Sequence, residues 1–89
     1  MCTMIAAKTG IAGSAKTLSE WVRVDEATVS YDHATHVWAE HALRLDLFTS
    51  GASSPRVAVE LDLASAKALV TRLDEVIAAA EAAGDGGRA

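Results

Sequence analysis

The sequence predicts an α+β protein, with a four-stranded, mainly antiparallel sheet packed by one long C-terminal helix. Two patterns predict it. Apolar and polar residues alternate over several short segments between residues 20 and 62, as in strands with one buried face. From Leu63 onward, apolar residues recur at helical spacing. A chain of 89 residues has room for one core, so we expect a single domain over residues 1–84 and a disordered tail over residues 85–89.

Three short strands are expected in the first part of the chain. Thr3–Ala7 is predicted to be the first, and a Gly/Ser/Ala-rich connection is expected over Gly10–Glu20. Trp21–Asp25 and Ala27–His33 follow, and the alternation places Ala27, Val29, Tyr31 and His33 on one face. The junction at Asp25–Glu26 is compatible with a tight turn or with a bulge inside one longer strand.

The clearest alternation in the chain lies in Glu40–Phe48. His41 falls on the same side as three leucines, so we expect it on the buried face. Thr49–Pro55 has the composition of a turn, and Arg56–Asp62 is predicted to be the last strand. Short connections favour sequential hairpins over crossovers.

A helix is predicted over Leu63–Ala83. Asp62 is a suitable N-cap, and Gly84 is a suitable stop after the last turn. The apolar residues with helical spacing are Ala66, Leu69, Val70, Leu73, Val76, Ile77 and Ala80.

Composition narrows the class of protein. The net charge of −4, with eight Lys and Arg, argues against a nucleic-acid partner. The apolar half of the chain is rich in alanine and only 4% of residues are aromatic, so the core is expected to be thin. A homodimer or a bound metal is then a natural source of added stability. One cysteine, no long apolar run and no signal-peptide pattern predict a cytoplasmic protein without a membrane span.

All three histidines fall in one short stretch, as H-x2-H-x4-H. We expect His33 at the end of one strand, His36 in the connection and His41 at the start of the next strand. Three imidazoles at such a corner can ligate a divalent transition metal (Zn, Fe, Ni, Cu or Mn) and leave one position open for water or substrate. Glu40 is then the candidate general base, and it or Asp32 can orient the imidazole rings.

Other interpretations of this stretch stay open. Histidines at strand ends often only make local hydrogen bonds, and this spacing is not an established metal fingerprint. Metal-free acid–base chemistry at a partly buried His41 is a third possibility. If a metal is bound, Trp38 can line a small-molecule pocket beside it.

Two further motifs favour structural interpretations. Cys2 can offer a thiolate to a metal or a substrate, but a small apolar role in the first strand is the simpler reading. The segment GIAGSAKT is similar to a phosphate-binding loop, yet it has Ala15 where that motif requires glycine. We therefore expect a flexible loop and no nucleotide site.

The chain also resembles a small actinobacterial family of unknown function. The resemblance rests on MCTMIAAKTGIAGSAK, YDHATH, EHALRLD and RVAVELDLASAKALV and covers Met1 to about Ala80. Similar sequences are expected to read YDHP, so Ala34 departs from the pattern and changes the stiffness of the loop without moving the histidines. The resemblance implies a bacterial cytoplasmic protein, and it assigns no catalytic role to any residue of this chain.

Two functions follow as hypotheses. The first is a small metal-binding protein with ligands His33, His36 and His41, which can also act as a metal-dependent enzyme that activates water or a small-molecule carbonyl or enol. The alternative is a non-enzymatic dimeric binding or assembly module that uses its sheet face or an edge strand.

Overall fold

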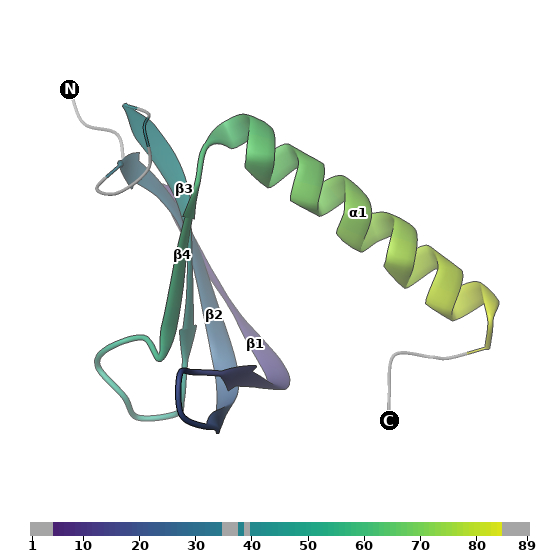
Figure 1. The fold of residues 1–89 in the computed structure, drawn as a ribbon, viewed down its shortest axis with the longest axis horizontal. Coiled ribbons are helices and arrows are strands. Elements are labelled where there is room, and N and C mark those ends of the chain that lie inside the picture. Colours follow the sequence, from purple (N-terminus) through teal and green to yellow (C-terminus); the bar gives the residue numbers. More distant parts are fainter. Residues whose placement is uncertain (1–4, 35–37, 39, 85–89) are drawn as a thin grey trace.

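The computed structural model describes residues 5–34, 38 and 40–84. Four strands precede one helix (Figure 1). The sheet order is β1-β2-β3-β4, and each neighbouring pair is antiparallel. The predicted fold class and the sequential hairpins are thereby confirmed. The elements are β1 (Ile5–Lys16), β2 (Trp21–His33), β3 (His41–Phe48), β4 (Val57–Leu61) and α1 (Leu63–Ala82).

The first strand is much longer than the sequence predicts. The connection expected over Gly10–Glu20 is wrong, because β1 continues to Lys16 and only Thr17–Glu20 turns the chain. The backbone N–H of Thr17 closes that turn by donating to the carbonyl of Glu20 at 2.7 Å. Pairing with β2 overrides the weak strand propensity of the glycines and serines. The GIAGSAKT segment therefore lies in β1 and its turn, and no helix follows it directly.

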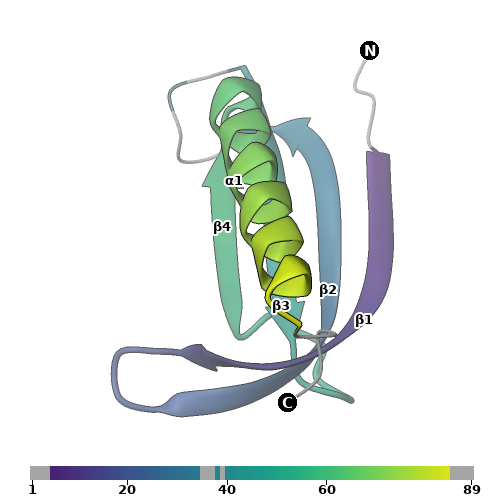
Figure 2. The same ribbon diagram turned by 90° about the vertical axis from the view of Figure 1, so that its right-hand side faces the viewer.

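A bulge lies in β1 and not in β2. β2 runs without interruption through Asp25–Glu26, so of the two alternatives for that junction the tight turn is wrong. Gly10 pairs with Glu26 and Gly13 pairs with Val24, which leaves Ile11 and Ala12 opposite the single residue Asp25. An extra residue of this kind bends and twists a strand. Beyond the bulge, β1 and β2 continue as a two-stranded ribbon that extends past β3 and β4 (Figure 2).

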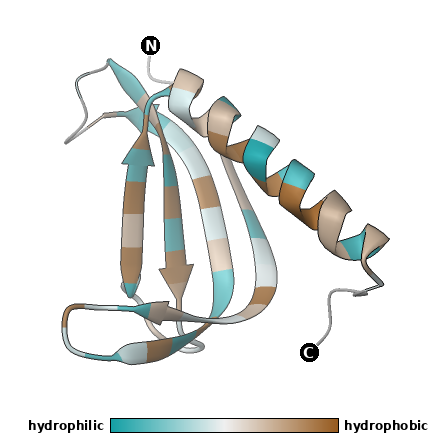
Figure 3. Ribbon diagram, turned by 45° about the vertical axis from the view of Figure 1, so that its right-hand side comes forward, coloured by the Kyte–Doolittle hydropathy of each residue, from teal (hydrophilic) through white to brown (hydrophobic). Residues whose placement is uncertain are grey.

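The sheet has one apolar and one polar face. The register aligns Tyr31, Leu43 and Leu61 across β2, β3 and β4, and it aligns Ser30, Arg44 and Glu60 on the opposite face. The alternating colours along β3 and β4 in Figure 3 follow this pattern. The remaining apolar rows are Val29–Leu45–Val59 and Ala27–Leu47–Val57.

The helix begins at Leu63, as the sequence predicts, and ends at Ala82, one residue before the predicted end. The side chain of Asp62 caps it by accepting the backbone N–H of Ser65 at 2.7 Å. Gly84 follows the last turn with φ of 95°, a left-handed conformation that favours glycine. Only the first part of α1 approaches the sheet, where Leu63, Ala66 and Val70 lie over Leu43. Figure 1 shows the rest of the helix running away from the strands.

The core of the described residues is small. Its buried hydrophobic residues are one valine and four alanines, and no large side chain is fully buried. They are Ala15, Val24, Ala27, Ala42 and Ala66. The sequence expectation of a thin core is therefore met, and most large apolar side chains keep part of their surface in solvent.

Candidate functional site

Two of the three histidines face each other across the β2–β3 hairpin. His33 ends β2, His41 begins β3, and the two residues are paired in the antiparallel register. The N–H of Ala34 donates to the carbonyl of Glu40 at 3.1 Å. The adjacent His33–His41 pair is then a non-hydrogen-bonded pair, the kind in which cross-strand side chains come closest.

The imidazole rings form a stack with a tyrosine. The ring centres of His33 and His41 are 4.8 Å apart, with an interplanar angle of 23°. Tyr31 stacks against His41 with ring centres 5.5 Å apart. His41 thus shares this end of the apolar face with Tyr31 and His33. The alternation along β2 places Tyr31 on the same face as His33, but its contact with His41 is visible only once the strands are in register.

Asp32 and Glu40, the acidic residues beside the two histidines, both accept backbone hydrogen bonds in the hairpin. Asp32 Oδ1 accepts the backbone N–H of His33 at 2.7 Å. Asp32 also lines a hollow on the polar face with Arg44 and Glu60. The carbonyl of Glu40 closes the hairpin, while its side chain is exposed.

The structure does not describe every predicted site residue. His36 and Cys2 lie outside the described residues. Trp38 is described and is fully exposed. Among residues 5–34, 38 and 40–84, no group of three or more His, Cys, Asp or Glu is placed to hold a metal ion.

The polar face also carries an ion pair between two residues of β3 that are not among the predicted site residues. Arg44 Nε lies 2.9 Å from Asp46 Oδ1, two positions along β3. Residues two apart in a strand share a face, so the alternation could have indicated this pair. The pair borders the hollow lined by Asp32 and Glu60, which gives that surface both signs of charge.

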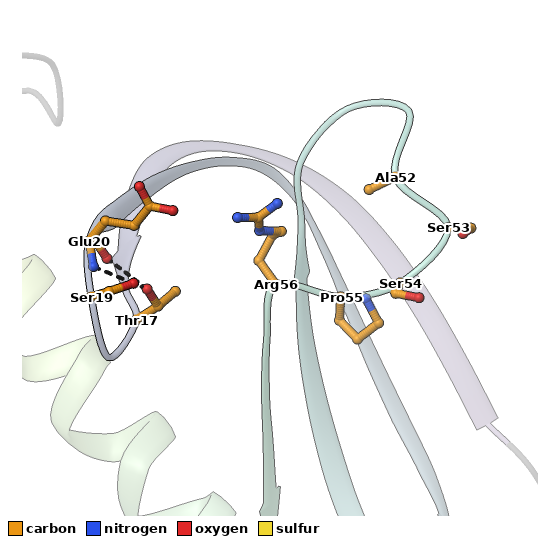
Figure 4. Close-up of a pocket in the computed structure, with 8 residues that line it drawn as sticks. All are labelled: Thr17, Ser19, Glu20, Ala52, Ser53, Ser54, Pro55 and Arg56. Carbon is orange, nitrogen blue, oxygen red and sulfur yellow. Dashed lines mark hydrogen bonds between the residues drawn. The ribbon is translucent and has the colours of Figure 1, made fainter.

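A second hollow lies at the other end of the molecule (Figure 4). The β1–β2 turn forms one wall, with Thr17 and Glu20, and the connection between β3 and β4 forms the other. The Arg56 side chain points into the space between them. Thr49 Oγ1 donates to the carbonyl of Arg23 at 2.5 Å, which joins the start of the β3–β4 connection to β2. No residue of this hollow was selected from the sequence.

The fold and the paired histidines define a small α+β protein with a histidine pair at one end of its antiparallel sheet. The chain belongs to the family of unknown function DUF6295, whose model matches residues 1–86. No curated protein and no solved structure matches the chain. Within the described residues, no helix has both the length and the hydropathy needed to cross a membrane.

Proposed function

We propose that this chain is a small metal-binding protein whose site is built on His33 and His41, with His36 as the third ligand. The observation that carries the proposal is the pairing of the two imidazoles across the hairpin. Two imidazoles that share one tetrahedral ion at about 2.0–2.1 Å have ring centres about 5 Å apart. The separation of 4.8 Å is close to that spacing, and because the rings are stacked at 23°, binding requires the imidazoles to rotate until both ring planes contain the ion.

The donor set favours a transition metal. Imidazole nitrogens suit Zn, Cu, Fe and Ni, and three of them leave a tetrahedral ion with an open position. In this proposal the open position activates water or the carbonyl or enol of a small molecule, and Glu40 serves as general base. The exposed Trp38 is the proposed contact for that molecule.

Metal analysis of protein purified without a histidine tag tests this function. We expect one equivalent of metal per chain, retained in Tyr31→Phe and lost in His33→Ala, His36→Ala and His41→Ala. Tyr31→Phe is the matched control because it keeps the ring stack and both imidazoles. Metal-free protein whose melting temperature does not change with added Zn²⁺ or Ni²⁺ contradicts the proposal.

Glu40→Gln separates binding from catalysis. Because Glu40 is not a proposed ligand, the variant is expected to keep its metal and to lose the ability to activate water. If Glu40→Gln keeps both its metal and the ability to activate water, Glu40 is not the general base and contributes only to the structure of the hairpin.

The open apolar surfaces favour a second candidate function, a non-enzymatic dimeric binding or assembly module. The apolar sheet face remains partly exposed at Val29 and Val59. β1 and β4 are also edge strands, which can pair with a partner. Sedimentation at micromolar concentration tests this function, and a monomer there contradicts it.

We also propose that the family is actinobacterial and that the protein acts in the bacterial cytoplasm. The MCTMI and YDH-x-x-H segments support the first statement, and the single cysteine supports the second. Fractionation of the native host with an antibody to this chain tests the location.

A further inference from the structure

Helix α1 carries an apolar stripe that continues beyond its contact with the sheet. Leu73, Val76 and Ile77 are 52%, 66% and 53% exposed. The stripe alternates steps of three and four residues, the spacing with which a helix packs against a neighbour. Its members are Leu63, Ala66, Val70, Leu73, Ile77 and Ala80, and Leu69 and Val76 flank it.

The apolar face of the sheet is open on the same side. α1 begins over Leu43, so its first turns lie on this face. Farther along, Figure 1 shows a gap that widens between the helix and the strands. Ile5, Val29 and Val59 remain exposed on the sheet. One chain therefore presents two unpaired apolar surfaces beside each other.

The exposed area is too large for a compact monomer. The chain exposes 6851 Å², whereas area scaling predicts roughly 5,000 Å² for a folded monomer of its mass, 9.3 kDa. The excess of about 1,900 Å² per chain is an upper limit for the area that each chain can bury, so a dimer interface reaches at most about 3,800 Å². That area falls within the range of about 2,000–5,000 Å² found for obligate homodimers.

The dimensions of the molecule agree with the area. Its radius of gyration is 14.7 Å, and a compact domain of this length has a radius of about 12 Å. The described helix accounts for part of this extension because it diverges from the strands along its length (Figure 1).

We propose that a second copy of this chain covers these surfaces, with α1 of each protomer lying against the apolar sheet face of the other. This inference rests on the second candidate function and specifies its partner. A two-fold dimer needs one surface that complements itself, and each chain supplies both a helix stripe and an open sheet face. Arg72 and Glu75, which form an exposed ion pair at 2.6 Å, lie off the stripe, whereas Lys67 borders its contact with Leu43.

The oligomeric state of the wild type and two variants tests the proposal. Sedimentation equilibrium is measured from 1 to 100 µM on wild type, on Leu73→Glu/Ile77→Glu and on the control Ala68→Glu, which adds a carboxylate opposite the stripe. We expect wild type and the control to be dimers. The dimer dissociation constant of the double variant is expected to be at least 100-fold higher than that of wild type. Circular dichroism confirms that each variant retains its sheet.

Cysteine cross-linking tests which surfaces meet. In a Cys2→Ser background, Val29→Cys/Ile77→Cys and Val59→Cys/Ile77→Cys are oxidised and separated by mass without reductant. A covalent dimer from at least one pair, with none from Ile77→Cys alone, supports helix-on-sheet packing. An efficient dimer from Ile77→Cys alone shows that the helices pair with each other, which overturns that packing.

The outcomes separate this inference from the second candidate function. A dimer that persists in Leu73→Glu/Ile77→Glu overturns the helix-mediated dimer but leaves a module that assembles through a sheet edge. A wild type that is monomeric at 100 µM overturns both.

Discussion

Ala66 and Val70 lie one turn apart on the same face of α1, yet Ala66 is 6% exposed and Val70 is 55% exposed. Residues four apart on a helix point in nearly the same direction, so a helix that follows a surface buries both. The difference places Val70, which lies beside Leu43, at the edge of the contact between α1 and β3. Beyond Val70, Leu73, Val76 and Ile77 are each more than half exposed within the described part of the chain.

Thermal stability is expected to depend on protein concentration. If the core is completed by a second copy, unfolding is coupled to dissociation, and mass action raises the melting temperature as the chain becomes more concentrated. Scanning from 5 to 500 µM is expected to show a rising melting temperature for wild type and for Ala68→Glu. A constant melting temperature in wild type contradicts coupled folding and assembly.

The Asp62 cap predicts a defined response to acid. The backbone N–H of Ser65 and then its hydroxyl hydrogen-bond the carboxylate, and both lower the pKa of Asp62 below its usual value. A carboxyl whose pKa is lower in the folded state stabilises the fold above its unfolded pKa, and this stabilisation is lost as pH falls through the folded value. Below about pH 4, wild type is therefore expected to lose this contribution.

Asp62→Ala removes that cap at every pH. The variant is expected to melt at a lower temperature than wild type at pH 7, and the difference is expected to shrink on acidification. Glu81→Ala, an exposed carboxylate in the last turn of α1, is the control. Equal shifts for the two variants at all pH values contradict a role for the cap.

Two glycines are expected to respond differently to substitution. Gly51 adopts φ of 82° in the β3–β4 connection, so Gly51→Ala is expected to cost about 1–2 kcal/mol of unfolding free energy. At Gly13 a Cβ meets only Val24 Cγ2, at 4.0 Å. Gly13→Ala is therefore expected to stabilise the protein by about 0.4–1 kcal/mol, because alanine restricts the unfolded chain. Chemical denaturation of both variants measures the two effects, and a larger loss in Gly13→Ala contradicts the assigned bulge geometry.

The histidine pair predicts a metal-dependent stability. With metal at a hundred times its dissociation constant, wild type is expected to gain about 2.7 kcal/mol. His41→Ala is expected to lose that gain and, without metal, to change the unfolding free energy by about 1 kcal/mol or less, as for other cross-strand pairs. Urea titrations with and without Zn²⁺ measure both quantities. A gain that survives in His41→Ala places the metal elsewhere.

The periodicity of the sequence determined the two sheet faces and the helix. Alternation placed Tyr31 and His33 on one face of a strand, and helical spacing between Asp62 and Gly84 defined α1. These features depend on residues close together in the chain, so local patterns are sufficient to predict them. The cluster of three histidines was also visible in this way, as a hypothesis about metal binding.

The pairing of strands in the tertiary structure decided which residues lie opposite each other in the sheet. β1 extends to Lys16 because β2 offers it a partner, and the bulge falls at Ile11–Ala12 because two strands of unequal residue number must stay in register. The stacking of His33, His41 and Tyr31 and the departure of α1 after Ala66 likewise depend on contacts between distant segments. Helical spacing alone identifies an apolar stripe, but only the folded chain shows that its own sheet leaves most of that stripe uncovered.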